Sequence, residues 1–328
     1  MPEQLAFTIE VFMNGLMAGV LYALVALGFV LIYKASGIFN YAQGVMALFA
    51  ALTLVGIMDG QVPFSHLINA ILGTEVHHFG WHVPAFLAIL LTMVVMIVLA
   101  YCVQRFVFRY LVGQEPIILF MATIGLAYFL EGVGDLMWGS EIKTLDVGLP
   151  QGINVWIDEF TFEATGYGFF IDNLDIVASI VAAILVIGLV MFAQYTKQGR
   201  AMRAVADDHQ AALSVGVSLN FIWILVWSLA GFVALVAGIM WGTKLGVQFS
   251  LSLIALKALP VLMLGGFTSI PGAIVGGLII GVGEALFEFS VGPLIGGATE
   301  NWFAYVLALL FLVFRPQGLF GEKIIERV

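Results

Sequence analysis

The sequence is poor in charge and has almost no cysteine. Only 10% of its 328 residues are charged, and Cys102 is the single cysteine. One cysteine cannot form an intramolecular disulfide, so no disulfide framework holds this fold. Soluble domains carry about a quarter charged residues, so the composition excludes a soluble enzyme and a disordered scaffold. The 12 Lys and Arg against 21 Asp and Glu also leave no basic surface for nucleic acid.

Signals for nucleotide binding, catalysis and export are missing as well. The chain has no GxxxxGK[ST] loop to hold ATP phosphates. Its apolar runs contain no His with carboxylates at a usable catalytic spacing, so we expect no enzyme activity and no catalytic residue. The first ten residues lack Lys and Arg, so we expect the first apolar run to stay in the mature chain rather than act as a cleaved signal.

What is abundant is apolar sequence, at 62% of residues and a mean hydropathy of +1.08. Crossing about 30 Å of hydrocarbon takes about 20 apolar residues in a helix. Two candidate runs are imperfect: one contains Lys257 and Pro260, and another opens with Asn40 and Gln43. We therefore predict an all-α polytopic membrane protein with eight or nine transmembrane helices, some of them broken. The runs are 11–33, 38–58, 83–104, 116–138, 174–195, 219–241, 253–267, 271–290 and 300–314.

Lys and Arg follow alternate runs, which predicts the orientation. Cytoplasmic loops carry an excess of these residues. With nine spans all of the groups fall on one side, so the N-terminus is predicted outside and the C-terminus in the cytoplasm. The groups are Lys34, Arg105 with Arg109, Lys197 with Arg200 and Arg203, and Arg315 with Lys323 and Arg327.

Two segments on the predicted outer side, 59–82 and 139–173, are too long for simple turns. The stretches INVWIDEFTF and ATGYGFF alternate or are aromatic, which favours a small strand-containing extracytoplasmic loop region. Plain loop insertion and a docking surface for another protein are alternative interpretations. His77, His78 and His82 lie close together in 59–82, but a metal site usually needs a further ligand in fixed geometry, so we expect none. We expect 1–328 to form a single transmembrane domain.

Glycines recur four residues apart in three places: Gly15 with Gly19, Gly272 with Gly276, and Gly277 with Gly281. Small residues at this spacing share a helix face and let helix backbones approach closely in lipid. This pattern predicts a packed helix bundle and does not indicate a function.

The longest polar segment on the predicted inner side is 196–218. Gly199 precedes a run of good helix formers, and Gly216 stands where a helix would stop. A helix this polar would lie along the membrane surface and could offer small side chains to a partner. A solvated connector is the other interpretation.

Four stretches carry a resemblance that covers nearly the whole chain. GRAMRAVADDHQAALSVGV is similar to the cytoplasmic coupling loop of ABC-importer permeases of the branched-chain amino acid type, a group that includes urea and amide permeases. The chain departs from that loop in one respect: Gln210 stands where the family has Glu. The other three stretches are GLMAGVLYALVALGFVLIYKASGIFNYAQG at 15–44, LGGFTSIPGAIVGGLIIGVGEAL at 264–286, and FRPQGLFG at 314–321.

The resemblance implies a permease subunit of the bacterial cytoplasmic membrane, without cofactors of its own. Its implied partners are two ATP-binding subunits that hold ATP and Mg²⁺, a second homologous permease in a heterodimer, and an extracytoplasmic solute-binding protein. The solute would be a branched-chain amino acid; urea, short amides and organic acids are alternatives. Contact with the ATPase would involve Arg200, Arg203, Asp207, Asp208, Ala211, Ala212 and Gly216.

Polar residues inside the apolar runs are candidates for the translocation path, because ionisable groups there cost about 2.5–3.5 kcal/mol each. Lys257 and Glu284 could pair across adjacent helices or reach water separately. Helix-to-helix hydrogen bonding explains the neutral residues equally well. A stand-alone channel or secondary transporter using Lys257 and the acids is the rival function. The neutral candidates are Asn14, Tyr22, Asn40, Gln43 and Thr123.

Overall fold

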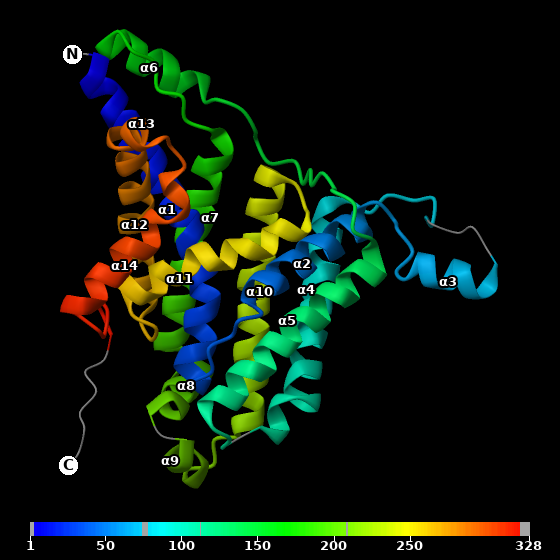
Figure 1. Ribbon diagram of the computed structural model, residues 1–328. Coiled ribbons are helices and arrows are strands. Elements are labelled where there is room, and N and C mark those ends of the chain that lie inside the picture. The colour runs from blue at the N-terminus through cyan, green and yellow to red at the C-terminus, as the bar shows by residue number, and fades with distance from the viewer. Residues whose placement is uncertain (1–2, 74–77, 112, 208, 322–328) are drawn as a thin grey trace. The chain divides into compact units, whose positions relative to one another are not determined.

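A computed structural model describes residues 3–73, 78–111, 113–207 and 209–321, and this part of the chain is helical (Figure 1). Short 3-10 turns at Phe108–Tyr110, Phe249–Leu253 and Thr299–Asn301 connect some of the helices. The helices are α1 (Glu3–Ser36), α2 (Gln43–Met58), α3 (Ser65–Leu72), α4 (Ala85–Phe106), α5 (Pro116–Trp138), α6 (Val155–Thr165), α7 (Asn173–Tyr195), α8 (Lys197–Asp207), α9 (His209–Ser214), α10 (Leu219–Leu245), α11 (Ile254–Gly265), α12 (Ile270–Ser290), α13 (Gly292–Ile295) and α14 (Phe303–Phe314).

Each predicted apolar run coincides with a helix. In the described residues six helices are long and apolar enough to cross a membrane: α1, α4 (continued to Tyr110), α5, α7, α10 and α12. The other three apolar runs form shorter helices, namely α2, α14 and the stretch Phe249–Gly265 that contains α11. The prediction of an all-α polytopic membrane protein is therefore confirmed, whereas the number of spans and their orientation remain predictions.

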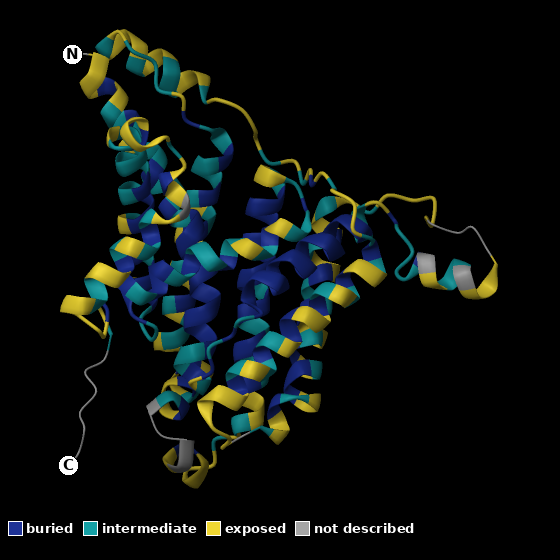
Figure 2. Cartoon of the chain, viewed as in Figure 1, coloured by how far each residue is buried: buried dark blue, intermediate teal, exposed yellow. Residues whose placement is uncertain are grey.

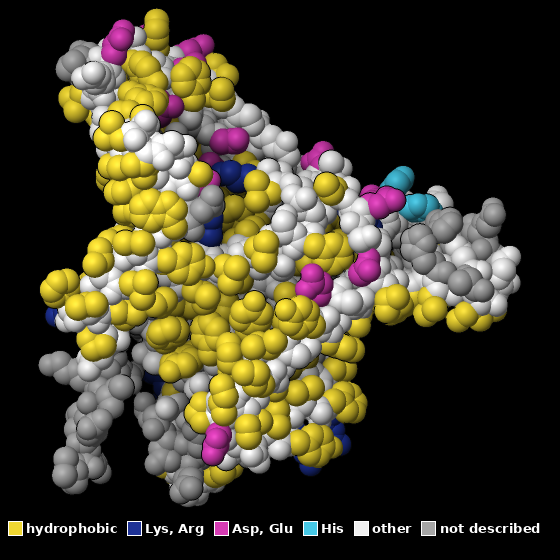
Figure 3. Space-filling view, viewed as in Figure 1, with side chains coloured by type: hydrophobic (Ala, Val, Ile, Leu, Met, Phe, Trp, Pro, Cys, Tyr) yellow, Lys and Arg dark blue, Asp and Glu magenta, His cyan; other side chains and the backbone are white. Residues whose placement is uncertain are grey.

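Exposure along these helices fits a lipid environment. The outward side chains of α4, α5 and α7 are large and apolar, for example Phe86, Tyr128 and Ile184. Figure 3 shows hydrophobic side chains spread over much of the visible surface. Soluble proteins rarely expose apolar area on this scale.

The chain forms two compact units within the predicted domain. Unit 1 comprises 1–30, 149–190 and 256–328, and unit 2 comprises 31–148 and 191–255. In unit 2, α2 is buried along nearly its whole length (Figure 2), as its all-round apolar sequence requires. The backbones of α2 and α10 touch closely, since a Cβ on Gly238 would overlap the carbonyl of Ala47.

The glycine pattern has its packing role in unit 1. Gly15 and Gly19 of α1 face Gly277 and Gly281 of α12, and a Cβ on any of the four would overlap backbone atoms of the opposite helix. Van der Waals contact between backbones is the main attraction available to helices in lipid. The predicted close helix packing is thus confirmed for this pair.

The structure corrects the prediction of strands in 139–173. Residues 155–165 of the INVWIDEFTF region form α6, and the described part of 139–173 contains only isolated bridges, such as Ile153 with Asp172. The end signals explain the helix: Asn154 Oδ1 accepts a hydrogen bond from the Ile157 amide at 2.9 Å, and Gly166 has φ +75° after the last turn. Local capping outweighs the alternating pattern. Segment 59–82 likewise contains a helix, α3, and the bridge Gln61–His78.

Candidate functional site

Asn40, Gln43 and Thr123 come together where the chain passes from α1 to α2. All three side chains are at most 1% exposed. Asn40 Nδ2 donates to Gln43 Oε1 at 3.3 Å, and Asn40 Oδ1 accepts from the Ala42 amide at 3.2 Å. Gln43 Nε2 reaches the Ala230 carbonyl of α10 at 3.3 Å. The amides therefore hold a broken segment that has no continuous helical ladder.

Thr123 of α5 completes this junction. Its Oγ1 accepts from the Tyr41 amide at 3.1 Å and lies 3.1 Å from the Phe39 carbonyl and 2.8 Å from the Phe120 carbonyl. Irregular backbone at membrane depth must have its polar groups satisfied inside the protein. We call Asn40, Gln43 and Thr123 the junction cluster; its neutral groups are hydrogen-bonded to the protein itself.

Tyr22, Lys257 and Glu284 form a second cluster in unit 1, the ionisable cluster. Lys257 Nζ donates to Tyr22 Oη at 3.4 Å and lies 5.6 Å from the centre of the Tyr22 ring. The Tyr22 hydroxyl is in turn hydrogen-bonded to Glu284, which also feels the charge of Lys257. Lys257 and Glu284 thus meet through Tyr22, which contacts both; a direct ion pair between them stays a prediction.

Hydrogen bonding in the ionisable cluster is incomplete. Glu284 is 5% exposed, and its Oε1 has no hydrogen-bond partner among the described residues. Asn14, two turns before Tyr22 on α1, is half-buried. A buried carboxylate oxygen without a donor is costly, so this cluster is the better candidate for contact with a moving solute.

Pro260 changes the backbone hydrogen bonding of α11 next to Lys257. Proline lacks an N–H, so inside α11 it leaves the carbonyl of Leu256 without its helical donor. The Tyr305 hydroxyl of α14 donates to that carbonyl at 2.8 Å. This bond satisfies a carbonyl that the proline leaves free within the continuous helix α11, directly beside Lys257.

The polar segment 196–218 forms two short helices, α8 and α9. Met202 and Val205 of α8 are buried, whereas Arg200 and Arg203 are exposed, and Arg203 Nη2 lies 3.4 Å from the Gln194 carbonyl. Asp207 is the last residue of α8. Asp208 lies outside the described residues, as does His77 of the outer histidine group.

In α9 and the turn after it, the predicted contact residues divide by exposure. Ala212 is 2% exposed and packs inward, whereas Ala211 and Gly216 are exposed. Leu213 and Val215 expose 53% and 76% of their surface beside them. Gly216 has φ +87°, which explains a glycine at this stop. Sequence reasoning did not assign Leu213 and Val215 to the contact, although apolar residues so close to Ala212 in a polar segment were a usable signal.

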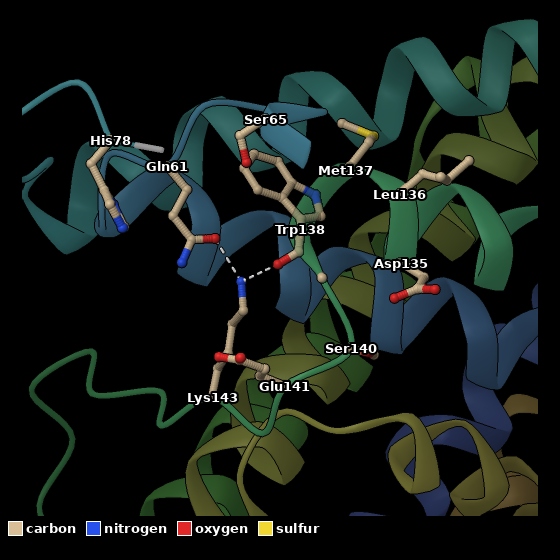
Figure 4. A pocket seen from close by; sticks show the side chains of 11 residues that line it. Gln61, Ser65, His78, Asp135, Leu136, Met137, Trp138, Ser140, Glu141 and Lys143 are labelled. Atoms are coloured by element: carbon tan, nitrogen blue, oxygen red, sulfur yellow. Dashed lines mark hydrogen bonds between the residues drawn. The ribbon is translucent and has the colours of Figure 1, made fainter. Parts of the chain in front are cut away.

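A polar pocket of about 470 Å³ lies at the end of α5, and sequence reasoning missed it (Figure 4). Its side chains come from the segments that follow α2 and α5 and from the end of α5 itself. Lys143 is central: its Nζ donates to Gln61 Oε1 and to the Trp138 carbonyl, both at 2.6 Å. The lining residues are Gln61, Ser65, His78, Asp135, Leu136, Met137, Trp138, Gly139, Ser140, Glu141 and Lys143.

Lys143 is also electrostatically unusual. Burial lowers the pKa of its ammonium, while the charges of Asp59 and Glu141 oppose that shift. In the sequence it is the single Lys or Arg between Arg109 and Lys197, within an acidic stretch. That isolation was a signal, but the sequence does not reveal that Gln61 would lie beside it.

Comparison with known proteins then identifies the chain. The family described as "Branched-chain amino acid transport system / permease component" matches residues 11–315. The chain belongs to this family of transport permeases. The permease is 30% identical to the high-affinity branched-chain amino acid transport system permease protein BraD of Pseudomonas aeruginosa, over 100% of both chains.

Two further relatives show how far the similarity extends. The permease is 27% identical to the high-affinity branched-chain amino acid transport system permease protein LivH of Escherichia coli, again over 100% of both chains. It is 22% identical to the fructose import permease protein FruG of Bifidobacterium longum, over 80% of this chain and 74% of that protein. Similarity is thus higher and longer for the relatives named for amino acids.

Proposed function

We propose that the permease imports a branched-chain amino acid across the bacterial cytoplasmic membrane, driven by ATP hydrolysis in partner subunits. The observation that carries this proposal is the full-length match to relatives named for that transport. The weaker match to a fructose permease disfavours a sugar. The chain would bind no cofactor; ATP and Mg²⁺ would bind to two ATPase subunits.

The proposed topology has nine spans, with the N-terminus outside and the C-terminus in the cytoplasm. Six helices long enough to cross a membrane and three shorter apolar stretches in the described part of the chain support it, together with Lys and Arg groups that would all face the cytoplasm. In this topology α8 and α9 face the cytoplasm, and α3, α6 and the Lys143 pocket face the outside. A solute-binding protein would deliver the solute there.

Coupling to the ATPase would take place on α8 and α9. The inward face of α8 fixes the helix to unit 2, and the outward face offers Arg200, Arg203 and the apolar residues of α9. A short, exposed, partly apolar helix is a common protein docking element. Ala211 and Gly216 would touch the ATPase, Asp207 and Asp208 would lie at the contact, and Ala212 would support it from inside.

A second, homologous permease subunit would cover part of α5. Tyr128, in the middle of this helix, is 70% exposed, and next to Gly125 there is open space. Glu131 lies one turn further on. Polar groups at membrane depth are costly against lipid, whereas a partner helix can hydrogen-bond them. The path would then use the ionisable cluster and Asn14, with the junction cluster supporting it.

The coupling role is tested with Leu213→Glu in the assembled transporter. We expect solute-stimulated ATP hydrolysis to fall more than about tenfold, since a charge in an apolar contact costs roughly 1.4 kcal/mol or more. The subunits should still co-purify. Leu294→Glu is the matched control, because Leu294 is 82% exposed and lies in α13, outside the segment 196–218. Unchanged ATP hydrolysis and uptake in Leu213→Glu would contradict the coupling role.

Solute and energy source are tested by uptake into cells that lack the transporter. We expect complementation to restore leucine uptake, with excess isoleucine and valine competing and urea, acetamide and fructose not competing. Uptake of an amide or an organic acid instead would favour the alternative solutes. Flux by the permease alone under an ion gradient would favour a secondary transporter.

A further inference from the structure

The Lys143 pocket lies where three helices of unit 2 end. Helices α2, α5 and α10 stop at Met58, Trp138 and Leu245. Lys143 joins all three ends: its ammonium bonds Gln61 and the last carbonyl of α5, and its backbone pairs with Val247 in both directions, at 2.8 and 3.0 Å. Helix C-termini carry partial negative charge, so a cation at this place is electrostatically favoured.

The rim of the pocket carries the opposite charge. Asp135 and Glu141 line the pocket and are exposed, and neither has an ion-pair partner among the described residues. In Figure 4 Glu141 lies beside the Lys143 stem, whereas the Asp135 carboxylate lies apart from it, below Leu136. The Lys143 ammonium has three donors and bonds two acceptors, Gln61 Oε1 and the Trp138 carbonyl. The pocket thus presents a fixed ammonium with remaining donor capacity and two carboxylates.

The walls offer an apolar surface with one unused donor. Leu136, Met137 and Trp138 line the pocket. Trp138 is 6% exposed, its ring lies directly against Gly56, and its Nε1 has no hydrogen-bond partner among the described residues. A buried indole N–H usually finds a partner. The volume of about 470 Å³ is in the range of small-molecule sites.

We propose that this pocket binds a zwitterionic amino acid. Lys143 takes the carboxylate of the ligand, Asp135 and Glu141 take its ammonium, and its aliphatic side chain lies against Leu136 and Met137. The pocket would be a recognition subsite on the permease itself, separate from the site on a binding protein. Naming the ligand as an amino acid rests on the proposed function; the charge arrangement alone predicts a zwitterion.

The experiment measures binding of radiolabelled leucine to the purified full-length permease, without partners, in nanodiscs. Leucinamide lacks the carboxylate, and 4-methylpentanoate lacks the ammonium. We expect leucine to bind and both analogues to compete at least about tenfold more weakly, the loss expected for one charged hydrogen bond. Asp135→Asn and Glu141→Gln should each weaken leucine binding about tenfold, and the double variant should weaken it more.

Glu163→Gln is the matched control, since this exposed acid of α6 lies outside the pocket lining. It should bind leucine as the wild type does. Thermal unfolding of each variant without ligand shows that folding is intact, because both rim acids are exposed. A rise of the unfolding temperature with leucine is the second readout.

Three results would overturn the proposal: no leucine binding at millimolar concentration, equal binding of leucine and its two analogues, or unchanged binding in the double variant. Uptake by the complete transporter separates this failure from failure of the proposed function. ATP-dependent leucine uptake without leucine binding to the permease would reject the subsite and keep the transport function. Uptake of another solute would reject the amino acid function. Binding of that solute to the purified permease would then show whether the pocket is a binding site for it.

Discussion

The junction cluster and the ionisable cluster solve the same problem, polar side chains at membrane depth, in different ways. Asn40, Gln43 and Thr123 are neutral; Asn40 and Gln43 are hydrogen-bonded to each other, and all three are hydrogen-bonded to nearby backbone. Lys257 and Glu284 are ionisable, with the neutral Tyr22 between them, and one buried oxygen of Glu284 has no partner among the described residues. A satisfied network stabilises structure, whereas an unsatisfied one keeps binding capacity at a cost in stability.

We expect the largest effects on stability and uptake from substitutions at Lys257 and Glu284. Lys257→Met removes the charge that offsets a buried carboxylate, so we expect a loss of about 3 kcal/mol in the free energy of unfolding. Glu284→Gln should leave stability nearly unchanged and still reduce leucine uptake more than about tenfold. The double variant should regain stability without regaining uptake. Denaturant unfolding in detergent and uptake in cells measure the two effects, and a Glu284→Gln variant with normal uptake would place the cluster outside the path.

The junction cluster should show the opposite pattern. Thr123→Val removes the hydroxyl bonds to the Tyr41 amide and the Phe39 carbonyl, which keep their mutual bond of 3.2 Å, so we expect a loss of about 1 kcal/mol in unfolding free energy. Thr123→Ser keeps the hydroxyl and should lose much less. Uptake per folded molecule should stay normal in both variants. A stable Thr123→Val protein with poor uptake would reverse the two roles.

Tyr305 provides a smaller test, of the carbonyl that Pro260 leaves without a helical donor beside Lys257. Tyr305→Phe removes the donor to the Leu256 carbonyl, at an expected cost of about 1 kcal/mol. Pro260→Ala restores a backbone N–H at that position. In the Pro260→Ala background Tyr305→Phe should therefore cost less, and a double-mutant cycle measures the difference. Additive costs would show that Tyr305 does not compensate for the proline.

Lys143 gives the smallest expected effect and an intermediate case, a half-buried charge with two acceptors. Burial lowers the pKa of its ammonium below 10.5. Between the folded pKa and 10.5 the unfolded chain binds more protons, so stability relative to Lys143→Met should rise with pH in that window. At neutral pH both states are protonated, and the difference should not vary. Unfolding measured from pH 7 to 10.5 checks the slope, and a fall of the difference with pH would contradict the burial effect.

Hydropathy predicted the helices well, because a span must contain its own hydrogen bonds and its length is set by the bilayer. A pairing of Lys257 with Glu284 was also predicted, but not that Tyr22 would contact both. The prediction of strands in INVWIDEFTF was wrong, because the helix-end signals of Asn154 and Gly166 outweigh the alternating pattern there. The Lys143 pocket was not predicted, because residues 61 and 143 meet only through the packing of α2 against α5. No local sequence pattern indicates that packing.

We propose that this permease moves an amino acid only when a partner hydrolyses ATP. The most direct measurement is accumulation of radiolabelled leucine in proteoliposomes that contain the permease, its ATPase subunits, the second permease and the solute-binding protein. We predict accumulation that requires hydrolysable ATP at the face carrying α8 and α9 and that does not respond to an ion gradient. Accumulation by the permease alone under an ion gradient, with no ATP present, would contradict the account.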